Sequence, residues 1–152
     1  MTRTLGDFLT ESFHIEGMHR MVSKAEHKEA ERFMALERIE LQDMIDFVKV
    51  FQSNAKFRTE EGLNVHVGRH LPPPGGVAVG YALADLLHKA NEENSNPHLI
   101  HLEYELLHPF TDCNGRSGRI LWLWQSKRMI GKLPHLSFLH NFYYHALDNA
   151  RE

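Results

Sequence analysis

The chain has 152 residues, of which 42% are hydrophobic and 24% charged. These values are typical of one globular domain, which we place at residues 1–152. The net charge of −3 argues against a dedicated nucleic-acid-binding protein, because such proteins carry a clear basic excess. No apolar run has the roughly 18 residues of a membrane span, the first residues do not resemble a signal peptide, and the single cysteine excludes an internal disulfide, so we expect a cytoplasmic protein.

Hydrophobic residues recur at helical spacing through most of the chain and predict a mainly helical fold. The first predicted helix has an apolar side that includes Phe8 and Phe13, and Gly17 is suited to end it. A long helix is predicted next, with charged residues between its apolar positions. The predicted helices cover residues 7–20, 23–51, 77–94, 98–107, 115–130 and 135–150.

A different pattern between residues 57 and 76 predicts the one non-helical part of the fold. Residues 57–59 and 64–67 alternate like strands on either side of Glu60-Glu61-Gly62, so a β-hairpin is predicted over 57–68. The prolines that follow cannot be helical. His66 and His70 are four residues apart, but in an extended region this spacing is weak evidence for a zinc site.

Residues 108–119 read His-Pro-Phe-Thr-Asp-Cys-Asn-Gly-Arg-Ser-Gly-Arg and carry the side chains of a phosphate-handling site. His108 is suited to act as a general base near neutral pH. Asp112 is suited to Mg²⁺, which commonly uses only one or two protein carboxylates. Amides at a helix start and arginines bind phosphate oxygens, and this role fits Asn114, Gly115, Arg116 and Arg119. The alternative is that His108-Pro109 merely ends a helix and that the arginines are surface charges.

Residues 108–119 closely resemble the signature of the Fic family, His-Pro-Phe-x-Asp/Glu-Gly-Asn-Gly-Arg-x-x-Arg. They depart from it at one position, Cys113, where the family usually has Gly. Residues 57–73 resemble the flap of the family and the proline segment after it, so the resemblance covers roughly residues 24–130. It implies the Fic fold, a helical bundle with one β-hairpin flap over the active-site loop.

The activity that the resemblance implies is protein adenylylation, the transfer of AMP from ATP to a Ser, Thr or Tyr hydroxyl of a target protein. His108 would be the general base and Asp112 would hold Mg²⁺. The implied phosphate-binding groups are Asn114, the amides of Cys113 and Gly115, Arg116 near the β-phosphate and Arg119 at the γ-phosphate. The flap would bind the target by main-chain pairing at Val65, His66 and Val67.

The departure at Cys113 could be a tolerated small substitution, or it could have one of three further consequences. If the position requires a positive φ, a cysteine there costs on the order of 1 kcal/mol. The side chain could also crowd the phosphates and leave an inert nucleotide-binding or interaction domain. A cysteine within an anion-binding loop could instead have a lowered pKa. The retained Gly115 favours nucleotide transfer over the phosphate transfer of the death-on-curing branch, which has Lys there.

Residues 12–17 resemble the inhibitory-helix pattern of the same family, Ser/Thr-x-x-x-Glu-Gly/Asn. The resemblance implies that Ser12 and Glu16 are inhibitory, and that Glu16 pairs with Arg119 in the place of the γ-phosphate. The leading hypothesis is therefore an autoinhibited AMP transferase. The alternatives are removal of AMP from a modified protein, with Glu16 positioning a water, and an inert domain. We expect no nucleic-acid or membrane partner, and a homo-oligomer is left open.

Overall fold

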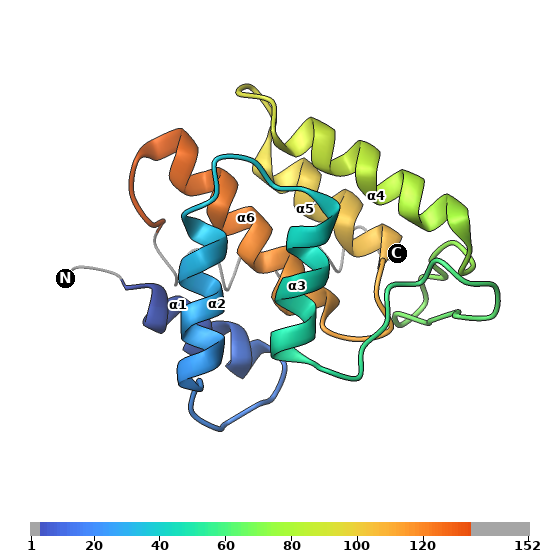
Figure 1. Cartoon of the computed structure of the whole chain (residues 1–152), viewed down its shortest axis with the longest axis horizontal. Helices are drawn as coiled ribbons and strands as arrows, with labels where there is room; N and C mark the ends of the chain where they lie inside the picture. Colours follow the sequence, from blue (N-terminus) through green and yellow to red (C-terminus); the bar gives the residue numbers. More distant parts are fainter. Residues whose placement is uncertain (1–3, 135–152) are drawn as a thin grey trace.

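The computed structural model describes residues 4–134, so the helix predicted over 135–150 lies outside the described residues. Six helices form this part of the chain (Figure 1): α1 (Leu5–Ile15), α2 (Lys24–Met34), α3 (Leu41–Phe51), α4 (Val77–Ala90), α5 (Pro97–Leu107) and α6 (Asn114–Ile130). The mainly helical class is confirmed. None of these helices combines the length and the apolar character needed to cross a bilayer.

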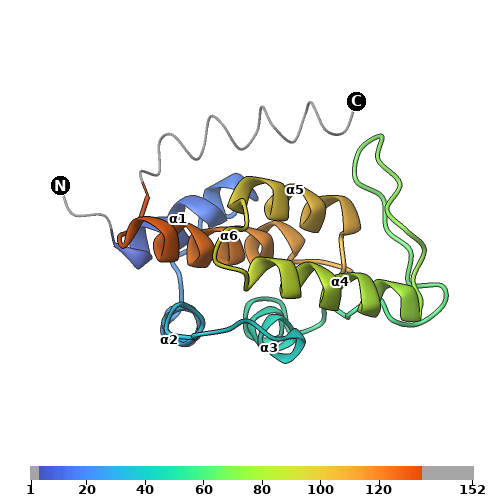
Figure 2. The ribbon, with the colours of Figure 1, turned by 90° about the horizontal axis from the view of Figure 1, so that it is seen from above.

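The central element is α6, which packs against α1, α2, α3 and α5. Figure 2 shows α2 and α3 on one side of α6, with α1 and α5 on the other. Every residue from Asn114 to Ser126 except Gly115 is buried in this arrangement. A helix that is covered on all sides belongs to the core, so the polar start of α6 is held in a rigid environment.

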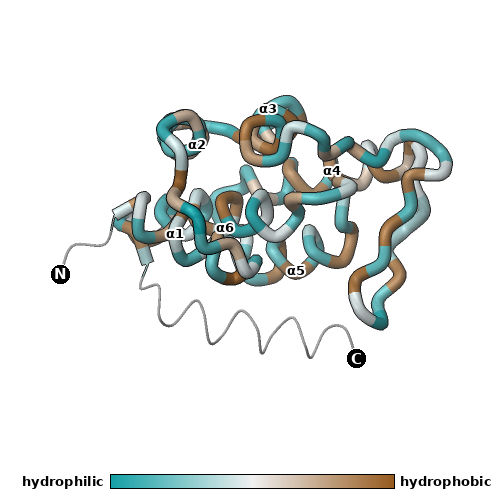
Figure 3. Tube along the Cα trace, turned by 90° about the horizontal axis from the view of Figure 1, so that it is seen from below, coloured by the Kyte–Doolittle hydropathy of each residue, from teal (hydrophilic) through white to brown (hydrophobic). Residues whose placement is uncertain are grey.

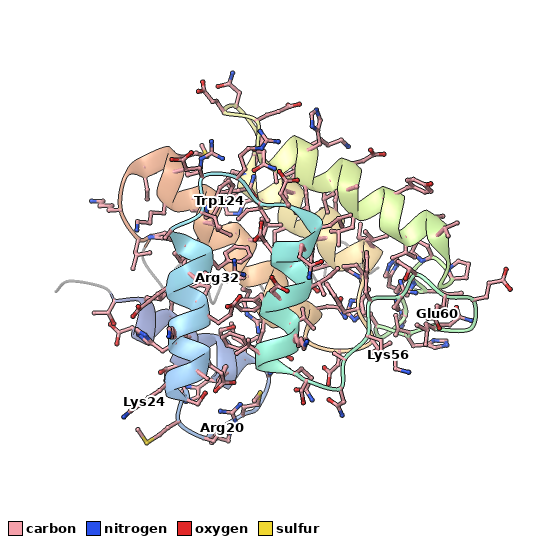
Figure 4. All side chains as sticks on the ribbon, in the orientation of Figure 1. Arg20, Lys24, Arg32, Lys56, Glu60 and Trp124 are labelled. Carbon is pink, nitrogen blue, oxygen red and sulfur yellow. The ribbon has the colours of Figure 1, made fainter. Side chains whose placement is uncertain are left out.

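The helix predicted over 23–51 is wrong in one respect, because it consists of two helices separated by residues 35–40. Distant side chains fix this break. Asn91 of α4 accepts a hydrogen bond from the Ile39 amide at 2.9 Å and donates to the Ile39 carbonyl at 2.8 Å. The indole nitrogen of Trp124, labelled in Figure 4, donates to the Leu36 carbonyl at 2.8 Å. Backbone groups that a continuous helix would pair internally are thus satisfied by α4 and α6.

The predicted hairpin over 57–68 is not formed, and no strand is present within residues 4–134. Phe57 instead forms an isolated antiparallel bridge with Phe110, and the Thr111 amide donates to the Lys56 carbonyl at 2.8 Å. The segment 56–58 therefore pairs with the loop after α5 and not with residues 64–67. Lys56 and Glu60 mark this connection between α3 and α4 in Figure 4, and Figure 3 shows it projecting from the helical body.

The ends of the helices follow the local signals in the sequence. Thr4 and Asp7 form a capping box at the start of α1, and Gly17 follows its end with a φ of +72°. Asn96 caps α5, whose first residue is Pro97, and Gly131 ends α6 with a φ of +75°. The observed α4 ends at Ala90, four residues before the predicted boundary.

Candidate active site

The loop between α5 and α6 begins and ends with residues in the left-handed region. His108 has a φ of +51° and Cys113 a φ of +69°, the two non-glycine residues with positive φ in the described part of the chain. Asn114, the first residue of α6, bonds back to Phe110 within the loop. Its carboxamide accepts from the Phe110 amide at 2.9 Å and donates to the Phe110 carbonyl at 2.8 Å. These two bonds close the loop on itself, and the bridge from Phe57 fixes it from outside.

His108 is half-buried at the end of α5, where its amide donates to the Tyr104 carbonyl at 2.9 Å. Its ring nitrogen Nδ1 lies 3.3 Å from the Glu105 carbonyl. Because a carbonyl can only accept, this contact requires the proton on Nδ1, and the lone pair of the neutral ring is then on Nε2. The geometry is that of a base oriented by its own helix.

The first turn of α6 offers unpaired amides. The N–H groups of Asn114, Gly115 and Arg116 have no acceptor within residues 4–134, and Cys113 provides no side-chain cap. The start of a helix carries a partial positive charge, and such amides bind anions. The Cys113 amide, which the resemblance had placed in the phosphate cradle, instead donates to Oδ1 of Asp112 at 2.7 Å.

The expected pair between Glu16 and Arg119 is present. Nη2 of Arg119 lies 2.7 Å from Oε1 of Glu16, and its guanidinium also donates to the Ser12 hydroxyl at 2.8 Å and to the Ser12 carbonyl at 3.0 Å. The arginine is 1% exposed, whereas the Glu16 side chain is 38% exposed. The end of α1 is thereby joined to the first turns of α6.

Gly115 lets this pair lie directly over the start of α6. A Cβ added at this glycine would overlap Oε1 of Glu16 and lie 2.9 Å from Nη1 of Arg119. The Glu16 carboxylate consequently occupies the space next to the unpaired amides. A negatively charged group from α1 lies where an anionic ligand of α6 would bind.

Two of the predicted phosphate-binding side chains are directed elsewhere. Arg116 donates to the Phe51 carbonyl at 3.2 Å and to the Gln52 side chain at 3.1 Å, so its guanidinium caps α3. Its Nη2 also lies 4.0 Å from Oδ1 of Asp112, so its charge is shared between α3 and that loop carboxylate. The carboxamide of Asn114 is used by Phe110. Both side chains hold the loop in shape, and Asn114 could bind a phosphate only through its backbone amide.

The conformation and the burial of Cys113 decide the questions of its backbone strain and of the pKa of its thiol. Its positive φ carries the expected strain, on the order of 1 kcal/mol. Its side chain is 4% exposed and packs with the hydrophobic core, and burial raises the pKa of the thiol to about 12. The lowered pKa is therefore wrong, because loss of hydration outweighs the attraction of Arg116 and Arg119. The thiol does not extend into solvent at the start of α6.

Asp112 is exposed at the mouth of the loop, with 61% of its side chain accessible. Only Oδ1 is hydrogen-bonded, and no group of three or more metal-ligating side chains occurs in residues 4–134. One accessible carboxylate fits Mg²⁺ that is held mainly by waters and a phosphate ligand, and does not fit an all-protein metal site.

The residues predicted to bind a target lie on the loop that replaces the hairpin. The backbone groups of Val65 and His66 make no hydrogen bonds among the described residues, and His66 is exposed. Val67 pairs with His70 across a tight turn, and His70 Nε2 contacts the Leu106 carbonyl at 2.7 Å. An extended, unpaired edge is thus available beside α5. No sequence pattern indicated the anchoring contact of His70, because its partner is a backbone atom.

A scan against protein-family models finds no match to this chain, and a search of curated proteins likewise finds none. The function must therefore be inferred from the contacts of the site itself.

Proposed function

We propose that this protein is a Fic-type adenylyltransferase that transfers AMP from ATP to a hydroxyl group of a target protein, and that Glu16 inhibits it. The observation that carries the proposal is the pair between Glu16 and Arg119 beside the open amides of α6. The two residues are far apart in the sequence, and only the inhibitory resemblance gave a reason to expect their contact. A buried arginine held by a carboxylate at an anion-binding helix start fits a phosphate site with its own inhibitor.

In the proposed reaction, the phosphates of ATP bind at the first turn of α6. The target hydroxyl oxygen attacks the α-phosphorus while Nε2 of His108 takes the hydroxyl proton. A bond forms between this oxygen and the α-phosphorus, the bond from the α-phosphorus to the bridging oxygen breaks, and pyrophosphate leaves. Mg²⁺, for which Asp112 is the candidate ligand, would supply positive charge to the phosphates when bound.

Inhibition follows from the single guanidinium of Arg119. A γ-phosphate needs these donors, and Glu16 and Ser12 already accept from them. ATP can bind productively only when the Glu16 carboxylate leaves, because two anions cannot share the site without strong repulsion. The 38% exposure of the Glu16 side chain provides a route for that movement while α1 stays in place.

The target would reach His108 from the loop at residues 63–67. An extended segment pairing with the open backbone of Val65 and His66 would present its hydroxyl side chain to the loop after α5. Such pairing reads mainly the backbone, so a protein partner with an accessible Ser, Thr or Tyr is proposed. The single thiol is free and buried, which is compatible with the proposed location in the reducing cytoplasm.

The test uses ATP labelled on the α- or the γ-phosphate with the Glu16→Gln variant and Mg²⁺. Protein-bound label is expected from α-labelled ATP alone, and it should disappear when His108→Ala is added. Glu31→Gln, which changes an exposed carboxylate on α2, is the matched control and should behave as wild type. Label from γ-labelled ATP would indicate phosphate transfer, and ATP binding without any label would indicate an inert domain. Release of AMP from a modified protein that depends on Glu16 would favour the reverse reaction.

A further inference from the structure

Arg58 is a fully buried arginine, with 0% exposure, and no carboxylate pairs with it in the described part of the chain. Its guanidinium donates only to backbone carbonyls. Nε donates to the carbonyl of His108 at 2.6 Å and Nη2 to that of Leu107 at 2.8 Å. Nη1 donates to the carbonyls of Leu63 at 3.0 Å and Pro73 at 2.8 Å.

Such a placement is costly unless every donor is used. Burial lowers the pKa of this guanidinium, because removal from water disfavours the charged form. Two of its four acceptors belong to the last residues of α5 and its cap, where the helix dipole is negative and carbonyls have no partner within the helix. The arginine therefore caps α5 from a segment some 50 positions earlier in the chain.

The Arg58 side chain binds both the backbone of the proposed base and the loop proposed to bind the target. On one side it binds His108, whose left-handed conformation persists only where the surroundings fix it. On the other side it binds Leu63 and Pro73, at the two ends of the loop that carries the open edge. The backbone of Arg58 adds two bonds, from its amide to the Pro109 carbonyl at 2.9 Å and from the Gly76 amide to its carbonyl at 3.0 Å.

We propose that Arg58 is a positioning residue that holds His108 and the target-binding loop in one rigid unit. A hydroxyl bound at the open edge is then delivered to the base at a fixed distance. The effect on catalysis rests on the proposed function. The coupling of His108 to the loop at residues 63–67 rests on the hydrogen bonds of Arg58 alone. Lysine cannot replace this arginine, because an ammonium group has three donors at one point and lacks the planar fork that reaches four carbonyls.

The experiment compares Arg58→Lys with Arg38→Lys, a matched change at an exposed arginine on the α2–α3 connection. In the Glu16→Gln background, Arg58→Lys should lower kcat by roughly 10-fold or more while KM for ATP changes by less than about twofold, since misplacement of a base affects the chemical step. In NMR spectra, the ring signals of His108 should shift, and the hydrogen-bonded amides of Leu63, Asn64 and Val67 should exchange faster. Arg38→Lys should change none of these.

Two outcomes separate this inference from the proposed function. If no variant transfers AMP, the NMR signals of His108 and of residues 63–67 still test the coupling. If Arg58→Lys does not fold, the Arg58 Nε–H signal of the wild-type protein serves instead, and it should exchange slowly with water because it is buried against the His108 carbonyl. Rapid exchange of that proton, or a folded Arg58→Lys protein with unchanged His108 signals and unchanged kcat, would overturn the inference.

Discussion

At the scale of single residues, Cys113 is the position where this chain departs from the signature that it otherwise matches. Its thiol is the only one in the chain and is buried with a pKa of about 12. The thiolate is the reactive form, so we predict that a thiol reagent such as iodoacetamide modifies the native protein very slowly at pH 8. Modification should become fast in denaturant, and mass spectrometry follows both rates. Fast modification of the native protein would contradict the burial.

The same thiol predicts a loss of stability in alkali. Because burial raises the pKa of this thiol from its ordinary value of 9.0 to about 12 on folding, its stabilising contribution to the folded state is complete below pH 9. This stabilisation is lost between pH 9 and 12, because in this range the thiol ionises in the unfolded chain but not yet in the folded protein. The loss is about 4 kcal/mol by the energy of one pKa unit. Urea unfolding of wild type and Cys113→Ala should show that the variant lacks this part of the pH dependence.

The residue types of the site could be predicted because they are contiguous in the sequence. Residues 108–119 specify a base, a carboxylate and a helix start with no knowledge of the fold. The directions of Arg116 and Asn114 could not be predicted, since Phe51 and Phe110 compete with a phosphate for them and only the folded loop decides. Arg58 gave no signal either, because an arginine in a strand-like segment is ordinarily exposed and its partners here are backbone carbonyls from four different positions.

At the scale of the elements, the connection between α1 and α2 keeps α1, the proposed inhibitory helix, in place. Arg20 binds both carboxylate oxygens of Glu26 at 2.8 Å, and the Arg20 guanidinium lies 4.8 Å from the centre of the Phe13 ring. Phe8, Leu9 and Phe13 of α1 are buried as well. The helix that carries Glu16 is therefore part of the core, so the proposed inhibition would be relieved by movement of the Glu16 side chain more readily than by detachment of α1.

Glu26 provides a test of that connection in acid. Burial alone would raise the pKa of Glu26, but hydrogen bonds from Arg20 and Ser23 outweigh it and lower the pKa to about 2. Its contribution to stability is thus present above pH 4.5, the ordinary pKa of a glutamate, and is lost as the pH falls toward 2. We expect Glu26→Gln to lower the unfolding free energy at pH 7 by about 2 kcal/mol, the size of a lost hydrogen bond to a charged group, and to flatten this acid dependence. Equal stability of Glu26→Gln and the surface variant Glu31→Gln in urea titrations would be inconsistent with the pair.

The break between α2 and α3 shows where sequence reasoning about elements stops. Leu36 and Leu41 continue the apolar spacing, and no Gly or Pro interrupts residues 35–40. The interruption comes from Asn91 and Trp124, which bind backbone groups of this segment from α4 and α6. Starts and ends with local signals, such as Asn96 before α5 and Gly131 after α6, were correctly predicted because the capping groups lie next to the helix that they end.

At the scale of the whole molecule, the buried α6 contrasts with the projecting connection between α3 and α4 (Figures 1 and 3). We predict that hydrogen exchange is slowest for amides in the buried middle of α6, residues 118–126, and fastest for Val65 and His66, whose amides have no acceptor in the described residues. Mass spectrometry of peptic fragments measures both. Strong protection of Val65 and His66 in the free protein would mean that the proposed target-binding edge is already occupied.

Glu16 and Arg119 connect helices from distant parts of the sequence, and the α1 carboxylate is proposed to control a phosphate site on α6. The most direct measurement is the initial rate of AMP incorporation from ATP by wild type and Glu16→Gln, at equal protein and Mg²⁺ concentrations. The amide lacks the charge that competes with the γ-phosphate, so we expect a rate at least about 10-fold higher for the variant, the change that corresponds to the loss of one charge-assisted contact. A rate for Glu16→Gln equal to or below that of wild type, with transfer clearly measurable in both, would contradict it.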